Sequence, residues 1–106
     1  MEAAFKALAE PRRRQILMLV REAELSAGEI AAQFEVTRPA VSQHLNVLKE
    51  AGLVSERQNG TRRLYRARPE GLGELRAFLE EFWDEHLAAL KREAEQKERS
   101  HVGRND

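Results

Sequence analysis

Cysteine is absent from the 106-residue chain. Without it there is no disulfide framework, no thiolate ligand for a metal ion and no thiol redox switch. A reducing cytoplasm is therefore the expected setting. Long apolar runs are also missing, since none approaches the ~18 residues that a membrane-spanning helix requires. The first residues, MEAAFKALAEPRRR, mix acidic and basic side chains without an apolar core, so we do not expect a signal peptide.

Net charge of either sign is absent as well, because 18 Lys and Arg residues balance 18 Asp and Glu residues. The global charge therefore gives no argument for a nucleic-acid partner. The distribution is uneven, however. Residues 53–68 carry five arginines, at positions 57, 62, 63, 66 and 68, against the single acid Glu56. Nucleic-acid binding depends on such a local excess, although an ordinary solvated strand is the alternative interpretation.

Apolar spacing predicts two helices at the start of the chain. The first covers residues 2–9 and places Ala4, Phe5 and Leu8 on one face. The second begins at Pro11, a residue suited to the first helical position, and runs to about residues 21–23.

Two further helices are predicted from capping signals. Ser26 followed by Glu29 has the pattern of a capping box, and Thr37 is a good N-cap for the next helix. Pro39 lies in the first turn of that helix, where the missing N–H has no partner to lose. Gly52 is expected to end the helix in a left-handed conformation.

A β-hairpin is predicted for the arginine-rich stretch. Asn59-Gly60 is a strong turn signal, because both central residues of a type I′ turn need positive φ. This turn would place Arg57 opposite Arg62, two like charges near the tip that an anion bound beside it would explain. It would also place Glu56 opposite Arg63, a favourable cross-strand pair.

A long helix is expected from about Leu72 to Glu98, after Pro69, Gly71 and Gly73 end the strand. The resulting fold class is mainly α with one β-hairpin, a winged helix-turn-helix. Residues 1–98 would form a single domain with dimerisation helices at both ends, and residues 99–106 a disordered tail.

Helix, short turn, helix and hairpin together predict a reader of duplex DNA. The second helix of such a unit can lie in the major groove. Val41, Leu45 and Leu48 share one face, so the opposite edge is exposed. Gln43 can bond adenine, Arg38 guanine or phosphate, whereas His44 suits a phosphate or packing role. The predicted β-hairpin is the wing of this fold, and its arginines suit phosphates or a minor groove. The predicted DNA-binding residues are Thr37, Arg38, Pro39, Ala40, Ser42, Gln43, His44, Arg57, Asn59, Thr61, Arg62 and Arg63.

The last predicted helix carries more apolar surface than a peripheral helix of one small core needs. Aromatic residues on such a surface are typical of interfaces. We therefore expect a homodimer, with an intramolecular core as the alternative; two-fold symmetry would match a palindromic site. The predicted interface residues are Phe5, Leu8, Leu75, Phe78, Leu79, Phe82, Trp83, His86, Leu87 and Leu90.

Residues 8–66 resemble the ArsR/SmtB family of winged-helix repressors. The segment LAEPRRRQIL at 8–17 is similar to the family opening L-x-[DE]-P-x-R-x-x-I-L. The segment SQHLNVLKEAGLV at 42–54 resembles its recognition-helix signature, and GTRRLY at 60–65 resembles its wing. The resemblance implies a homodimer, with the first and last helices at the interface, that binds operator DNA until an effector lowers its affinity.

The sequence departs from the metal-sensing members of that family. Their Cys-x-Cys pair is replaced by residues 26–28, Ser-Ala-Gly, after Glu24-Leu25. Asp84-x-His86 matches half of a second known site, but the partner positions hold Lys97 and Ser100. His86 is therefore expected to pack at the interface, and no metal or other cofactor is expected. Phe82-Trp83 with Leu87 and Leu90 is more similar to a metal-independent, SdpR-like branch.

These patterns predict a sequence-specific regulator of transcription, a repressor by resemblance, with no membrane partner and an unknown effector. An enzyme is not expected, since there is no nucleophile elbow, P-loop or zinc signature. Two alternatives stay open: a winged helix that uses its last helix to bind a protein partner instead of DNA, and a repressor that responds to a metal or small molecule at an unrecognised site.

Overall fold

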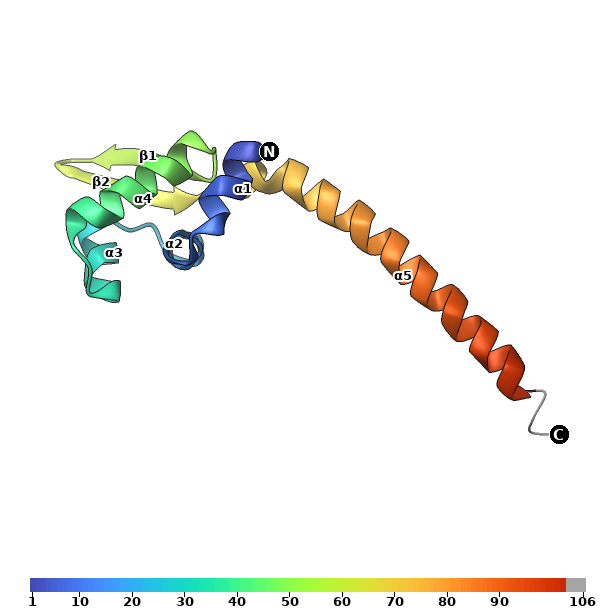
Figure 1. Cartoon of the computed structure of the whole chain (residues 1–106). Coiled ribbons are helices and arrows are strands. Elements are labelled where there is room, and N and C mark those ends of the chain that lie inside the picture. Colours follow the sequence, from blue (N-terminus) through green and yellow to red (C-terminus); the bar gives the residue numbers. More distant parts are fainter. Residues whose placement is uncertain (103–106) are drawn as a thin grey trace. The chain divides into compact units, whose positions relative to one another are not determined.

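A computed structural model describes residues 1–102, with side chains through residue 97 (Figure 1). The chain divides into two compact units, Met1–Leu75 and Arg76–Asp106. The stretch 1–98, predicted as one domain, spans the first unit and most of the second. The elements are α1 (Glu2–Ala9), α2 (Pro11–Glu22), α3 (Ala27–Phe34), α4 (Arg38–Glu50), β1 (Val54–Asn59), β2 (Arg62–Ala67), the 3-10 helix η1 (Pro69–Leu72) and α5 (Gly73–Val102).

The predicted helix starts of the first unit are confirmed. Ser26 and Glu29 form a capping box at α3: the Glu29 N–H donates to Ser26 Oγ at 3.2 Å, and the Ser26 N–H donates to Glu29 Oε1 at 3.0 Å. At α4 the Ala40 N–H donates to Thr37 Oγ1 at 3.2 Å, with Pro39 in the first turn. These bonds satisfy N–H groups that the helices leave without partners.

The turn between α3 and α4 and the end of α4 use left-handed residues. Glu35 has φ 54°, and the Val36 N–H then donates to the carbonyl of Ala31 at 3.3 Å. Gly52, with φ 75°, follows α4 as predicted. Both turns are short, so they restrict the direction of α4 relative to α3 before it and to β1 after it.

The core of the first unit is centred on the inner face of α4. Val41, Leu45 and Leu48 are fully buried there, as predicted. Burying side chains of this size stabilises a fold by roughly 1.5–3 kcal/mol each. In α1 the buried positions are Ala4 and Ala7, while Phe5 is 39% exposed, so Phe5 is not a core residue. The core cluster comprises Ala4, Ala7, Ile16, Val20, Ile30, Ala31, Val41, Leu45, Leu48, Leu53, Val54 and Tyr65.

The hairpin turn is displaced by one residue from its predicted position. Asn59 pairs with Arg62, so Gly60 and Thr61 are the central residues of the turn. Gly60 has φ 67°, whereas neither Asn59 nor Thr61 has a positive φ. A glycine at the first central position is the requirement of a type II′ turn. The predicted type I′ turn at Asn59-Gly60 is therefore wrong.

The shifted turn changes the cross-strand partners. Arg57 lies opposite Leu64, and Glu56 lies opposite Tyr65. The expected facing pairs of Arg57 with Arg62 and of Glu56 with Arg63 do not form, so a like-charge pair at the tip gives no argument for an anion. The hairpin is joined to the segment before α3 instead: Leu25 and Tyr65 exchange backbone bonds of 3.1 and 2.7 Å.

In the second unit α5 extends farther than predicted. The helix continues through residues 99–102, where the sequence predicts the start of a disordered tail; residues 103–106 lie outside the described residues. Within the described part, no helix is both long and apolar enough to cross a membrane. Most of the large apolar side chains of α5 are exposed, namely Phe78, Leu79, Phe82, Trp83, Leu87 and Leu90.

The close approach of η1 to the end of α4 gives a test of the first unit. A Cβ at position 71 would overlap the carbonyl oxygen of Gly52 and lie 3.2 Å from Leu53 Cδ2. Because that oxygen belongs to the backbone, we expect Gly71→Ala to lower the free energy of unfolding by about 1–3 kcal/mol, the usual magnitude of overpacking. Urea denaturation measures the change.

Gly73→Ala is the matched control. No atom lies within 4 Å of a Cβ at position 73, and this residue already has helical φ and ψ of −56° and −48°. Removing a glycine there should raise the free energy of unfolding by about 0.5–1 kcal/mol. Equal stability of the two variants would contradict the packing of η1 described above.

Candidate nucleic-acid interface

The outer edge of α4 presents the predicted reading residues. Because Val41, Leu45 and Leu48 occupy the core, the opposite side of the helix faces solvent. Thr37, Arg38, Pro39 and Gln43 are exposed, and Ala40, Ser42 and His44 are half-buried. Small residues between the longer ones leave the helix backbone accessible. An α-helix with this edge can enter a major groove of duplex DNA.

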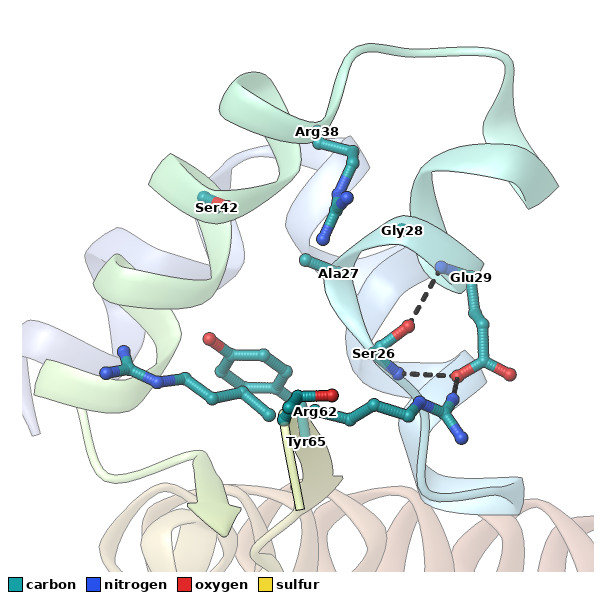
Figure 2. A pocket seen from close by; sticks show the side chains of 10 residues that line it. Ser26, Ala27, Gly28, Glu29, Arg38, Ser42, Arg62 and Tyr65 are labelled. Atoms are coloured by element: carbon teal, nitrogen blue, oxygen red, sulfur yellow. Dashed lines mark hydrogen bonds and ion pairs between the residues drawn. The ribbon is translucent and has the colours of Figure 1, made fainter. Parts of the chain in front are cut away.

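A groove of about 730 Å³ joins α4 to the wing. Figure 2 shows the guanidinium of Arg38 directed toward Gly28, with Ser42 one turn further along α4. A Cβ at position 28 would lie 3.3 Å from Arg38 Nε, so glycine provides the room for this side chain. The lining residues are Ser26, Ala27, Gly28, Glu29, Arg38, Ser42, Thr61, Arg62, Arg63 and Tyr65.

Five of the predicted DNA-binding residues thus meet in one groove, although they come from two separate parts of the sequence. Arg38 and Ser42 belong to α4, and Thr61, Arg62 and Arg63 belong to the hairpin. The other predicted residues do not line this groove. These are Thr37, Pro39, Ala40, Gln43, His44, Arg57 and Asn59.

Two wing arginines are paired with carboxylates that the sequence did not indicate. Arg57 binds Glu24 through two hydrogen bonds of 2.7 Å, from Nε to Oε2 and from Nη2 to Oε1. Arg62 forms an ion pair with Glu29, the capping-box residue of α3 (Figure 2). Each pair joins residues 33 positions apart. The only signal in the sequence was the capping box, which identified Glu29 as an ordered carboxylate and gave no indication of its arginine partner.

The carboxylates of these pairs stay charged at neutral pH. The pKa of Glu24 is lowered by the hydrogen bonds from Arg57 and by the nearby charges of Arg57 and Arg66. The pKa of Glu29 is lowered first by the backbone N–H and hydroxyl of Ser26 and then by Arg62. Opposite charges and hydrogen bonds to the charged form both favour ionisation. Much of the basic charge of the wing is therefore compensated within the free protein.

His44 is held by an arginine of α2. Arg13 Nη1 lies 3.5 Å from His44 Nδ1, and the same guanidinium donates to the carbonyls of Ala7 at 2.7 Å and Lys6 at 3.1 Å. A guanidinium can only donate, so we infer that Nδ1 accepts and that the proton of the neutral imidazole is on Nε2. The contact with Arg13 agrees with a packing role for His44, and a phosphate contact through its Nε2–H stays a prediction.

Metal ligands do not converge in the part of the chain that the structure describes. No group of three or more His, Asp or Glu side chains is arranged to hold an ion there. Asp84 and His86 lie on α5, where both side chains are exposed. The ring of His86 lies beside that of Trp83, with centroids 5.9 Å apart.

Comparisons with known proteins agree with this architecture. A family described as "Bacterial regulatory protein, arsR family" matches residues 10–56, from the N-cap of α2 into β1. The HTH-type transcriptional regulator Rv2034 of Mycobacterium tuberculosis is 48% identical over 86 residues, which cover 81% of this chain and 80% of that protein. The transcriptional repressor SdpR of Bacillus subtilis is 42% identical over 60 residues, which cover 57% and 67%.

A solved structure extends the agreement to the fold. The homodimeric winged helix-turn-helix DNA-binding domain Mb0332 from Mycobacterium bovis matches with a TM-score of 0.64 and 38% identity, over 81% of this chain and 80% of that one. The prediction of a winged helix-turn-helix is confirmed. The family match covers the helix-turn-helix, and the identity with Rv2034 covers most of both chains. The chain therefore belongs to the arsR family of bacterial regulatory proteins and is a DNA-binding transcriptional regulator.

Proposed function

We propose that the protein is a homodimeric repressor that reads a palindromic operator in the cytoplasm. The observation that carries this proposal is the groove in which Arg38 and Ser42 of α4 meet Thr61, Arg62 and Arg63 of the wing. A helix edge that reads bases and an arginine hairpin that contacts phosphates then lie on the same side of one unit. The repressor SdpR, with 42% identity over 60 residues, supports repression.

Within each subunit, α4 and the wing have separate tasks. Gln43 and Arg38, at the exposed start of α4, contact base edges, because amide and guanidinium groups can bond adenine and guanine in two places at once. Arg57, Arg62, Arg63 and the Nε2–H of His44 contact phosphates, which fix the position of the protein and carry no sequence information. Thr61 and Asn59 extend the phosphate contacts at the tip of the hairpin.

The second copy binds to the apolar side of α5. Phe82 and Trp83 are more than half exposed, at 55% and 57%, and a surface of large apolar residues on one helix is typical of a subunit interface. Phe5 and Leu8 of α1 are the interface residues that we propose in the first unit. The homodimeric relative Mb0332 supports a homodimer. Two-fold symmetry then spaces the two reading helices by about one turn of DNA.

The proposed repressor belongs to a metal-independent, SdpR-like branch. The chain has no cysteine for a thiolate site, and Asp84 and His86 lack the two further ligands expected of a metal site in α5. We assign His86 to the dimer interface, beside Trp83. The effector of the repressor is unknown.

Gln43 tests base reading. An operator is first selected from a random pool of duplexes, and binding is then measured by fluorescence anisotropy on that operator and on a scrambled duplex. Gln43→Ala should reduce the ratio of the two affinities by about 5- to 150-fold, the range of 1–3 kcal/mol for a bidentate base contact. Gln15→Ala, on the exposed side of α2, is the control. A selection that enriches no duplex would favour the protein-interaction alternative.

Arg63 tests the phosphate role of the wing. Arg63→Ala should weaken binding to operator and scrambled duplexes by the same factor, because phosphates are common to both. The slope of log affinity against log salt should also fall by about one, since the substitution removes one phosphate contact. Arg21→Ala, on the exposed surface of α2, serves as the charge-matched control. A change confined to the operator would contradict the division of tasks.

Trp83 tests the dimer. Removing an aromatic side chain from the centre of an interface commonly costs about 2 kcal/mol or more, so Trp83→Ala should weaken the dimer by about 30-fold or more. Sedimentation across a concentration series measures the dissociation constant. Asp84→Ala, on the opposite side of α5, is the control and should not change it. A wild-type protein that stays monomeric at micromolar concentration would disprove the interface.

A further inference from the structure

The carboxylates of Glu24 and Glu29 occupy arginine groups that the proposed function needs for DNA. Arg57 uses Nε and Nη2 for its two bonds to Glu24, and Arg62 uses Nη2 for Glu29. A phosphate bonds a guanidinium through the same pair of parallel N–H groups as a carboxylate does. A phosphate that uses these same N–H groups therefore has to displace the glutamate, and the N–H groups that stay free offer it fewer bonds.

These ion pairs lie where such an exchange can happen. The side chains of Arg57 and Arg62 are 58% and 53% exposed, so a phosphate can approach both without a change in the fold. Glu29 lines the groove, where it pairs with Arg62. Figure 2 shows its carboxylate between the Ser26 backbone and the Arg62 guanidinium.

Arg63 shows the contrast within the same hairpin. It lines the groove, yet no ion pair is found for it among the described residues, although Glu56 is near enough to feel its charge. Its guanidinium can take a phosphate without displacing a carboxylate partner. Neighbouring arginines of the wing thus differ in how much of their charge the free protein has already compensated.

We propose that Glu24 and Glu29 limit the affinity of the protein for DNA of any sequence, by competing with phosphates for Arg57 and Arg62. This inference rests on the proposed function, in which the wing contacts phosphates. Non-specific binding to DNA consists almost entirely of phosphate contacts, so this competition acts directly on non-specific affinity. Binding is left to depend more on the base contacts of α4.

Two substitutions remove the competing charges with little change in shape. Glu29→Gln keeps the capping box, because glutamine also serves at that position. Glu24→Gln tests the second pair at a residue with no capping role. Glu22→Gln is the control: Glu22 also pairs with an arginine, Arg21, at 2.6 Å, and it lines a different groove on α2. Thermal unfolding verifies that each variant is folded.

Anisotropy titrations of the full chain on the selected operator and on a scrambled duplex give the result. We expect each of Glu24→Gln and Glu29→Gln to tighten binding to both duplexes by about two- to fivefold, the range measured for exposed ion pairs. The control should change binding by much less. The gains should disappear at high salt, because screening weakens contacts between exposed charges.

A double-mutant cycle identifies the route of the effect. In an Arg62→Ala background, Glu29→Gln should give no more gain than the Glu22→Gln control, because the competed arginine is gone. A full gain in that background, or weaker binding by both glutamine variants, would overturn the proposal. Failure of the proposed function gives a different result, since Arg62→Ala and Arg63→Ala would then leave affinity for every duplex unchanged.

Discussion

The burial of one face of α4 is the constraint on which the interface depends. Val41, Leu45 and Leu48 are fully buried against the helices of the first unit. A rotation of α4 that moved Gln43 away from solvent would bring these side chains out of the core and lose roughly 1.5–3 kcal/mol for each one exposed. The direction of the reading edge is therefore a consequence of packing. The cap at Thr37 and the left-handed residues on either side of α4 fix where that edge begins and ends.

The electrostatic character of the wing depends on which arginines have partners. Counting residues gives five arginines against one glutamate between positions 53 and 68. In the folded chain Arg57 and Arg62 bind Glu24 and Glu29, and Arg68 lies 3.7 Å from Glu70. Among the described residues, Arg63 and Arg66 are the wing arginines for which no ion pair is found. A basic stretch in a sequence thus overstates the positive charge available to a phosphate, because acidic residues from elsewhere in the chain fold against it.

Local signals in the sequence predicted the helices, the caps and the reading edge, since each depends on residues within a turn or two. The hairpin register is a different case. Both the predicted and the observed turns contain Gly60, and moving the turn by one residue shifts each cross-strand partner by two. A shift of two keeps every side chain on its own face of the sheet, so the apolar pattern does not distinguish the registers. In the observed register Tyr65 also forms a bridge with Leu25, and this contact joins residues 40 positions apart. Local sequence patterns do not reveal such a contact.

The ion pairs of the wing and the contact between Arg13 and His44 escaped prediction for the same reason. Each joins residues more than 30 positions apart, and a sequence with balanced charge offers many such pairings. The sequence shows which charged groups the chain contains, but it does not show which of them are neighbours in the fold. Only the packing of the helices against one another and against the hairpin determines which of them meet.

The apolar face of α5 raises the question of what covers it in the assembled protein. The buried hydrophobic residues of the described chain lie between Ala4 and Tyr65, so the core is built without the aromatic residues of α5. In a dimer, the two copies cover each other's apolar face of α5, and the assembly carries two reading helices. If carboxylates offset part of the phosphate affinity in each subunit, a single reading head binds weakly. Joining two heads makes the second binding event intramolecular, so occupancy would then depend on both half-sites being correct at once.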